Sequence, residues 1–505
     1  MWHGHHPVTS LPTGKRFEHP LRRRDSPWRA PRLNDVHGKI NSTRVARIVT
    51  VKNVDDVVAT VRRASRCDRA ISIAGARHAM GGQQFGEDTL NLDMRGLDRM
   101  LALDAERGTV TVQAGIDWPK LMRDYLVAQH GRQVQWGVRQ KQTGADHLTV
   151  GGAVSANIHG RGLRMKPFVE DLLELEVVDA QGELIRCSRT ENAELFRLVV
   201  GGYGLVGVVV SAKLRLVPRQ KLQRVVMLLG VDELAEAFQA RIDAGYLYCD
   251  FQFAIDPTSD DFLRRGVFSC YRPVALATPI PSDQLRLSKD DWAELLLLAH
   301  VDKRRAFERF AEFYLASSGQ IYWSDTHQLN VYLDDYHPAL DKYLCSATPA
   351  SEVITEIYVP RDRLAAYLDA AREYLRARRA DLIYGTIRLI ERDDESFLPW
   401  ARERYACVIF NLHTPHTPRG LAETTARFRD LLDLALPHNG SFFLTYHRFA
   451  TPAQLLACYP QFPEFLRLKR RYDPADRFQS TWYRHQRNLL TQTHEQRRRL
   501  TGTEA

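Results

Sequence analysis

The sequence of 505 residues has no uninterrupted apolar run near the roughly 18 to 20 residues that a membrane-spanning helix needs. Residues 1–10 also lack the apolar core of a secretion signal, so we expect an intracellular, cytoplasmic protein. A hydrophobic fraction of 44% and a charged fraction of 26% exclude disordered and collagen-like chains. A chain of this length predicts two or three folded domains.

Cysteine is scarce and scattered along the chain. The seven cysteines include no CxxC pair and form no even-numbered framework. They are Cys67, Cys187, Cys249, Cys270, Cys345, Cys407 and Cys458. This pattern excludes a disulfide scaffold and a cysteine-based metal site. We therefore expect reduced thiols and predict no metal ligands.

The net charge of +9 is accompanied by arginine runs near both ends, at residues 22–24 and 497–499. Such runs are typical of solvated basic tails that can contact an anionic membrane surface. We expect peripheral membrane contact at most and no nucleic-acid partner, although a nucleic-acid binder stays the weakest alternative.

Apolar periodicity predicts a chain of mixed helices and strands. Helices are predicted at residues 55–64, 118–128 and 361–377, and strands at 71–73, 89–92, 109–113 and within 205–218. A hairpin is predicted at 173–188, around a turn at 180–182. Pro218 ends the strand pattern there, which predicts a domain boundary near residue 220.

The first chemical signal is a glycine-rich loop at residues 74–84, which we call the His78 loop; it reads AGARHAMGGQQ and follows a predicted strand. Glycines let backbone amides approach a ligand closely, so the loop is typical of an anion cradle. It has neither the GxGxxG spacing of a dinucleotide-binding helix nor the Gly-Lys-Ser/Thr of a P-loop. Nicotinamide-Rossmann and ATPase folds are therefore not predicted.

Two further segments are rich in small residues. Residues 148–162, the small-residue run, read LTVGGAVSANIHGRG, which leaves room for a flat ligand against the backbone. Residues 201–209, the glycine turn, read GGYGLVGVV and lead into a strand. Taken alone, the His78 loop or the glycine turn is also compatible with an ordinary tight turn.

In order and approximate spacing, these three segments resemble the vanillyl-alcohol oxidase / p-cresol methylhydroxylase superfamily of FAD-binding oxidoreductases. The resemblance covers residues 40–218 well and the remainder more loosely. Residues 75–81 are similar to cytokinin dehydrogenases. Residues 151–160 look like alditol, aldonolactone and decaprenylphosphoryl-ribose oxidases, which also place His-Gly after Val-Gly-Gly. The glycine turn resembles the strand that meets the adenine side of FAD.

This resemblance implies an α+β, two-domain FAD-binding fold of the p-cresol methylhydroxylase (PCMH) type with an α+β substrate cap. The expected parts are an irregular N-terminal arm at 1–35, the FAD domain at 36–220, the cap at 221–440, a C-terminal segment returning to the FAD domain at 441–490, and a basic tail at 491–505. The residues expected to contact FAD are Ala74, Gly75, Ala76, Arg77, His78, Ala79, Gln83, Gly151, Gly152, Ser155, Asn157, Ile158, His159, Gly160, Gly202, Gly204, Gly207 and Val208.

His78 stands where cytokinin dehydrogenases and alditol oxidases carry a histidine bonded to the flavin 8α methyl. A neutral imidazole nitrogen is a nucleophile, and a rigid turn can hold it against an electrophilic methyl group. The resemblance therefore implies covalent FAD, with a noncovalent cofactor hydrogen-bonded by His78 as the alternative. Residues 144–152 contain no cysteine, so the second attachment of berberine-bridge relatives is not expected.

For catalysis, Arg388 matches the Arg of a sugar-alcohol oxidase strand, but Thr386 stands where that strand carries Glu. Asp146 stands near the sequence position at which cytokinin dehydrogenases carry a catalytic Asp. Its spacing to the Val-Gly-Gly turn that follows is shorter by two residues. His447 and His159 are alternative bases, and we expect Glu356 to be structural.

The expected reaction oxidises an alcohol group of a sugar, polyol or related small molecule by hydride transfer to flavin N5, with oxygen or another electron acceptor. The alternatives are a cytokinin-like amine dehydrogenase, a reductase that uses a nicotinamide donor, and a flavin-binding protein without turnover.

Overall fold

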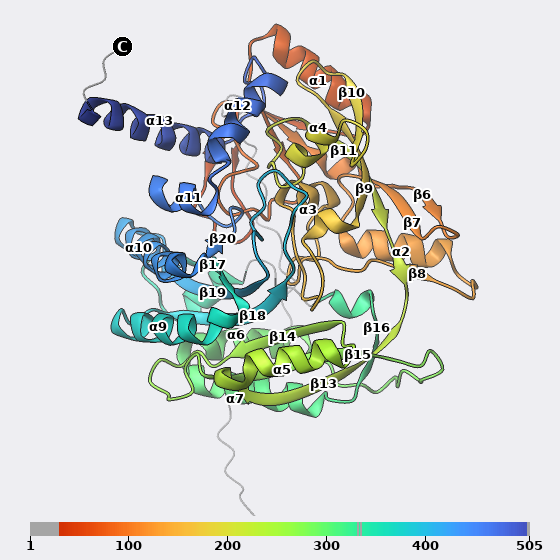
Figure 1. Ribbon diagram of the computed structural model, residues 1–505, viewed down its shortest axis with the longest axis vertical. Coiled ribbons are helices and arrows are strands. Elements are labelled where there is room, and N and C mark those ends of the chain that lie inside the picture. The colour runs from red at the N-terminus through yellow and green to blue at the C-terminus, as the bar shows by residue number, and fades with distance from the viewer. Residues whose placement is uncertain (1–29, 331–332, 334–335, 502–505) are drawn as a thin grey trace, which may run out of the picture.

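The computed structural model describes residues 30–330, 333 and 336–501. The predicted arm at 1–35 and basic tail at 491–505 therefore lie partly outside the described residues. The chain forms two lobes. Three small sheets and a five-stranded sheet make up the first lobe, and one eight-stranded sheet makes up the second (Figure 1).

The first lobe begins with a parallel sheet in the order β3-β5-β4 and a short antiparallel pair. The strands are β1 (Arg32–Leu33), β2 (Thr43–Arg44), β3 (Arg47–Thr50), β4 (Ile71–Ala74) and β5 (Leu90–Asp93). Helix α1 (Val54–Arg66) begins at a capping box made by Asn53 and Asp56, which satisfies backbone N–H groups of the first turn. Its apolar face, including Val57 and Val61, packs in one core with strands β4 and β5.

A five-stranded antiparallel sheet in the order β10-β9-β11-β7-β6 completes this lobe. Its strands are β6 (Met100–Asp104), β7 (Thr109–Gln113), β9 (Leu172–Val178), β10 (Leu184–Ser188) and β11 (Val208–Arg215). A separate two-stranded pair is formed by β8 (Trp136–Gly137) and β12 (Val217–Pro218). The helices are α2 (Trp118–Ala128), α3 (Val150–Ala156) and α4 (Ala193–Val199).

The second lobe is an antiparallel sheet in the order β16-β13-β15-β14-β18-β19-β17-β20. Its strands are β13 (Lys221–Gly230), β14 (Tyr248–Phe253), β15 (Arg265–Val274), β16 (Ile321–Trp323), β17 (Ala350–Pro360), β18 (Leu382–Ile390), β19 (Tyr405–Pro415) and β20 (Ser441–Phe442). The helices that contact it are α5 (Val231–Asp243), α6 (Lys289–Val301), α7 (Lys303–Ala316), α8 (His337–Tyr343), α9 (Leu364–Ala377) and α10 (Pro418–Ala435).

After β20 the chain crosses back to the first lobe. The backbone N–H of Met80 donates to the Thr445 oxygen at 2.9 Å, and Phe478 forms a parallel bridge with Ile71 beside β4. The helices of this stretch are α11 (Pro452–Cys458), α12 (Phe462–Tyr472) and α13 (Thr481–Thr501). The C-terminal segment therefore returns to the first lobe at the His78 loop and β4, and the blue helix α12 lies at the upper end of that lobe (Figure 1). Short 3₁₀ turns are η1 (Met94–Gly96), η2 (Phe168–Asp171), η3 (Thr326–Gln328), η4 (Arg361–Arg363) and η5 (Leu436–His438).

Most predicted elements are present in the structure. The predicted helix 118–128 and strand 109–113 coincide with α2 and β7, and the predicted hairpin corresponds to β9 and β10. The predicted helix 361–377 begins as a 3₁₀ turn and becomes α-helical at Leu364. None of the described helices combines the length and hydropathy needed to cross a membrane.

One expectation about cysteine is wrong. Cys249 and Cys270 lie directly opposite each other on β14 and β15 and are joined by a disulfide. Their separation of 21 residues gives no sequence signal, because the strand register alone brings the two sulfur atoms together.

Candidate functional site

A cavity of about 1160 Å³, its open mouth included, lies where the His78 loop, α3, the glycine turn and the C-terminal segment meet. The expected FAD contacts that line it are Gly75, Ala76, Arg77, His78, Ala79, Gln83, Gly151, Gly152, Ser155, Ile158, Gly204 and Gly207. The fold thus brings all three sequence signals to one cavity.

Hydrogen bonds hold the His78 loop in shape. The Gln83 side chain accepts from the Gly81 amide at 2.9 Å and donates to the Leu444 oxygen at 2.6 Å. Arg77 has a positive φ of 66°, which turns the chain. Within the described residues, the amides of residues 76–79 donate to no protein acceptor. Unpaired amides at a cavity wall favour an anionic ligand such as a diphosphate.

Close backbone packing explains the small residues of α3. A Cβ atom at Gly151 would lie 3.0 Å from the Ala114 backbone oxygen, and one at Gly75 would lie 2.2 Å from Thr149 Oγ1. The Thr149 hydroxyl also caps α3 by accepting from the Gly152 amide at 3.2 Å. The glycines therefore let the loop and the helix meet, so that backbone rather than side chains forms this wall of the cavity.

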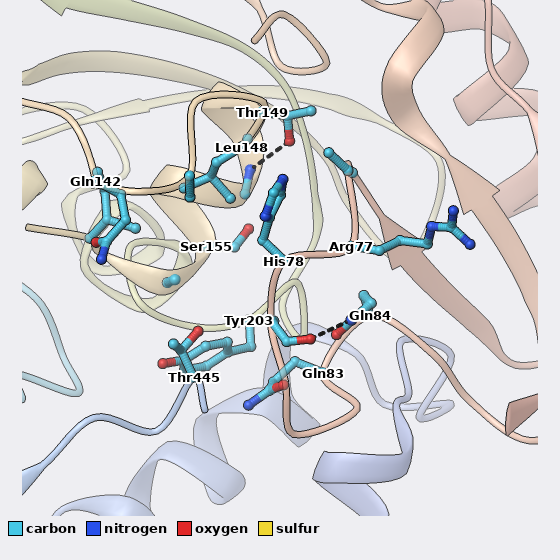
Figure 2. Close-up of a pocket in the computed structure, with 18 of the residues that line it drawn as sticks. Arg77, His78, Gln83, Gln84, Gln142, Leu148, Thr149, Ser155, Tyr203 and Thr445 are labelled. Carbon is cyan, nitrogen blue, oxygen red and sulfur yellow. Dashed lines mark hydrogen bonds between the residues drawn. The ribbon is translucent and has the colours of Figure 1, made fainter. Parts of the chain in front are cut away.

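The His78 ring points into the cavity near Ser155 and Thr149, whereas the Arg77 side chain extends the other way (Figure 2). His78 Nδ1 lies 2.8 Å from Nε2 of His37, which also lines the cavity. Burial and the neighbouring His37 lower the pKa of His78 to about 3, so the imidazole is neutral and keeps a nucleophilic lone pair at neutral pH.

Six of the expected FAD contacts do not line the cavity. They are Ala74, Asn157, His159, Gly160, Gly202 and Val208. Asn157 instead ends α3 with a positive φ of 47° and donates to Asp393 at 2.9 Å. A Cβ at Gly202 would lie 2.0 Å from the Leu198 oxygen, so this glycine serves a tight turn.

The three expected catalytic residues also lie outside the cavity lining. Asp146 is paired with Lys141 Nζ at 2.6 Å and accepts from the Asn330 amide at 2.8 Å. His447 packs against Phe428 and Phe449, and its burial lowers the pKa to about 3. Because both side chains are enclosed by protein, the geometry does not support either as a base that contacts substrate.

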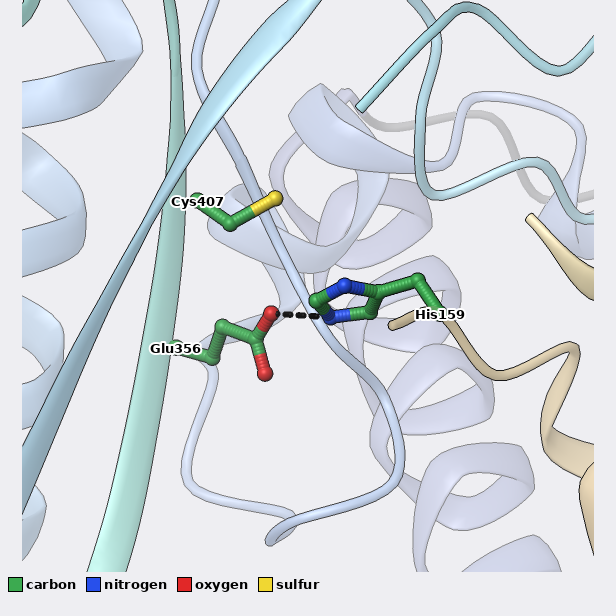
Figure 3. Close-up of side chains that lie close together, drawn as sticks. All are labelled: His159, Glu356 and Cys407. Carbon is green, nitrogen blue, oxygen red and sulfur yellow. Dashed lines mark hydrogen bonds and ion pairs between the residues drawn. The ribbon is translucent and has the colours of Figure 1, made fainter. Parts of the chain in front are cut away.

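His159 and Glu356 form a hydrogen-bonded pair that links the lobes (Figure 3). Arg388 is buried, and its charge acts on Glu356. His159 Nε2 lies 2.6 Å from Glu356 Oε1, and both side chains are fully enclosed. Burial raises the pKa of Glu356, but the His159 charge and hydrogen bond and the Arg388 charge outweigh it and leave that pKa below its usual value. Glu356 is therefore ionised, and the positive charge of Arg388 stabilises the carboxylate.

Tyr446 connects this pair to the cavity. It lines the cavity, and burial together with the negative charge of Glu356 raises its pKa well above the usual value. Neither the placement of Tyr446 beside Glu356 nor a polar role of Glu356 was predicted, because the two residues are 90 positions apart and only the pairing of β20 with β17 brings their segments together. Lining residues outside the three motifs include His37, Gln142, Thr143 and Thr445.

Comparison with known proteins gives an independent result for the first lobe. Residues 45–188 match the family described as FAD binding domain. Cytokinin dehydrogenase 2 of Oryza sativa subsp. japonica is 35% identical over 174 residues, which are 32% of this chain and 29% of that protein. Cytokinin dehydrogenase 1 of Arabidopsis thaliana is 28% identical over 176 residues, which are 34% of this chain and 29% of that protein.

An uncharacterized oxidoreductase, ORF5 in the fasciation locus of Rhodococcoides fascians, is 30% identical over 174 residues, which are 34% of this chain and 37% of that protein. The chain thus spans about a third of the length of the curated relatives it matches.

Proposed function

Because residues 45–188 form an FAD-binding domain of the PCMH type, we propose that the whole chain is an FAD-dependent oxidoreductase that takes a hydride from a small organic donor. The cavity fits the cofactor, since the unpaired amides of residues 76–79 suit its diphosphate and the side-chain-poor wall at α3 suits a flat ring. Bound FAD would supply the hydride acceptor.

The His78 side chain supports a covalent FAD. It is neutral, lines the cavity and is held by His37 at 2.8 Å, so one ring nitrogen is oriented within a rigid loop. Joining this nitrogen to the 8α methyl group would release one proton from each partner and pass two electrons to the flavin, which oxygen or another acceptor would then take up. We propose a single histidyl link through His78.

The observation that carries the donor side is the placement of Tyr446, which lines the cavity and feels the charge of Glu356, itself paired with His159. An O–H or N–H donor must lose a proton when its carbon loses a hydride. Tyr446 can accept that proton on its oxygen while passing its own proton to Glu356. His159 would then hold the carboxyl group in place through its 2.6 Å contact.

An alcohol of a sugar or polyol is our first candidate donor, supported by the likeness of residues 151–160 to sugar-alcohol oxidases. A cytokinin-like amine is the second candidate, supported by the names of the relatives, whose similarity covers only about a third of the chain. Thr386, buried where the sugar-alcohol oxidase strand carries Glu, favours neither donor.

One set of samples tests the cofactor. Purified wild type and His78→Ala are denatured in acid, and intact mass and flavin absorbance are measured. We expect an FAD-sized mass increment in wild type alone, with His130→Ala, an exposed histidine, as the matched control. Free FAD released from wild type would contradict the covalent link, and a protein without flavin would contradict the proposed function.

A second experiment tests turnover. Wild type and Tyr446→Phe are mixed without oxygen with sugar alcohols, cytokinin amines or NADPH, and flavin bleaching is followed. We expect bleaching by one alcohol or amine class and a rate lower by roughly 100-fold in Tyr446→Phe, the low end of general acid–base effects. Bleaching by NADPH alone would indicate a reductase. A yellow protein that no donor bleaches would indicate flavin binding without turnover.

A further inference from the structure

A second group of side chains with metal-ligand chemistry lies in the eight-stranded sheet. It consists of His300 on α6, His337 at the start of α8, Glu352 on β17, Asp381 just before β18 and His413 on β19. We call these five residues the His300 cluster. None of them lines the cavity described above. The cluster therefore needs an explanation separate from FAD chemistry.

Strand register creates the centre of the cluster. Glu352 lies directly opposite His413 in the β17–β19 ladder. His300 Nε2 lies 3.2 Å from Glu352 Oε1, and His413 Nδ1 lies 3.5 Å from the same oxygen. His337 Nε2 contacts the other oxygen, Oε2. Three imidazoles thus converge on one carboxylate whose side chain is 4% exposed.

These separations are those of ligand atoms around a metal ion. With bonds of about 2.0 to 2.2 Å, a tetrahedral zinc site places neighbouring ligand atoms roughly 3.3 to 3.6 Å apart. The contacts of 3.2 and 3.5 Å lie close to this range. Ligand atoms of His300, Asp381 and His413 also lie within 4.8 Å of one another.

A second observation concerns hydrogen bonding. Although buried, His300 Nε2 makes no hydrogen bond within the described residues, so its approach to Glu352 is close but not aligned for N–H donation. A buried imidazole nitrogen without a hydrogen bond is placed to bind a metal. Asp381 differs, because its carboxylate is already paired with Lys303 Nζ at 2.8 Å.

We propose that the His300 cluster binds one divalent transition-metal ion of the zinc class. The ligands are Glu352 together with His300 and His413, whose nitrogens approach the same Glu352 oxygen. Three protein ligands leave the fourth position of a tetrahedral zinc site open. The ion would join α6, β17 and β19 and so fix the outer part of the second lobe.

The test uses the purified full chain with its flavin. Metal is removed with a chelator, Zn²⁺ is added, excess is dialysed away, and metal per chain is measured by mass spectrometry beside flavin content. We expect about one Zn²⁺ per chain in wild type and in His130→Ala, and a loss of at least tenfold in His300→Ala and His413→Ala. No retained Zn²⁺ in wild type would overturn the proposal.

A conservative variant guards against misfolding. His413→Gln keeps a polar side chain of similar reach but removes the imidazole. Loss of Zn²⁺ with unchanged flavin content and circular dichroism supports the proposal. Full Zn²⁺ retention by both His413→Gln and His300→Gln would overturn it, because the metal would then be held elsewhere.

Discussion

At the scale of single residues, position in the packed structure decides what each histidine can do. His78 and His447 both have a pKa lowered to about 3, largely by burial. His78 lines the cavity beside His37, whereas His447 packs against Phe428 and Phe449. Two histidines with the same protonation state therefore have different chemical roles.

The burial of His447 predicts a pH dependence of stability. In the unfolded chain His447 gains a proton below its ordinary pKa of 6.5, whereas the folded protein resists that proton down to about pH 3. Stability contributed by neutral His447 is therefore present above pH 6.5 and falls as pH drops from 6.5 toward 3, by up to about 1.4 kcal/mol per pH unit.

Urea unfolding of wild type and His447→Leu between pH 7.5 and 4.5 measures this effect. As pH falls, we expect the unfolding free energy of wild type to decrease more than that of His447→Leu, which has no imidazole to protonate. Parallel pH profiles for the two proteins would contradict the prediction, because they would show that folding does not lower the pKa of His447.

At the scale of elements, contact between α3 and the strand end at Ala114 sets one wall of the cavity. The Gly151 amide donates to the Ala114 oxygen at 2.7 Å, and a Cβ at Gly151 would approach that oxygen to 3.0 Å. At Gly152 the nearest atoms belong to the side chains of Leu148 and Thr149, at 3.2 Å. Side chains can move, whereas this backbone segment is tied into the sheet.

Gly151→Ala should therefore destabilise the protein by about 1 to 3 kcal/mol, typical of an overpacked core. Gly152→Ala is the matched control, and we expect a smaller change because its neighbours can rotate. Thermal unfolding and flavin content measure both variants. Equal stability of the two variants would show that α3 shifts without cost.

At the scale of the whole molecule, the first lobe is completed by residues more than 350 positions away. Phe478 is fully buried in one core with Val57, Ile71 and Leu92. The same C-terminal segment carries Thr445 and Tyr446 to the cavity. Stability of the FAD domain and composition of the site are therefore coupled through this segment.

Phe478→Ala should cost about 3 to 5 kcal/mol of unfolding free energy, as for other large-to-small core changes. It should also make the C-terminal segment more sensitive to limited proteolysis and increase loss of any noncovalent flavin. Leu276→Ala, at a side chain 59% exposed, is the control that should change little. Unchanged proteolysis would show that the segment is held by other contacts.

The sequence by itself determined the type of cofactor site. Glycine and small-residue runs can be recognised locally, because close backbone approach and positive φ depend on the residue at each position. The His78 loop, Gly151, Gly152 and Gly204 were predicted on this basis and line one cavity.

The tertiary structure alone decided the polar groups around that site. The link from Tyr446 through Glu356 to His159, the enclosure of Asp146 and His447, the Cys249–Cys270 disulfide and the His300 cluster all join segments distant in sequence. Such contacts follow from strand register and lobe packing. A single sequence carries no local signal for them, because a one-residue change in register would place each side chain on the opposite face of the sheet.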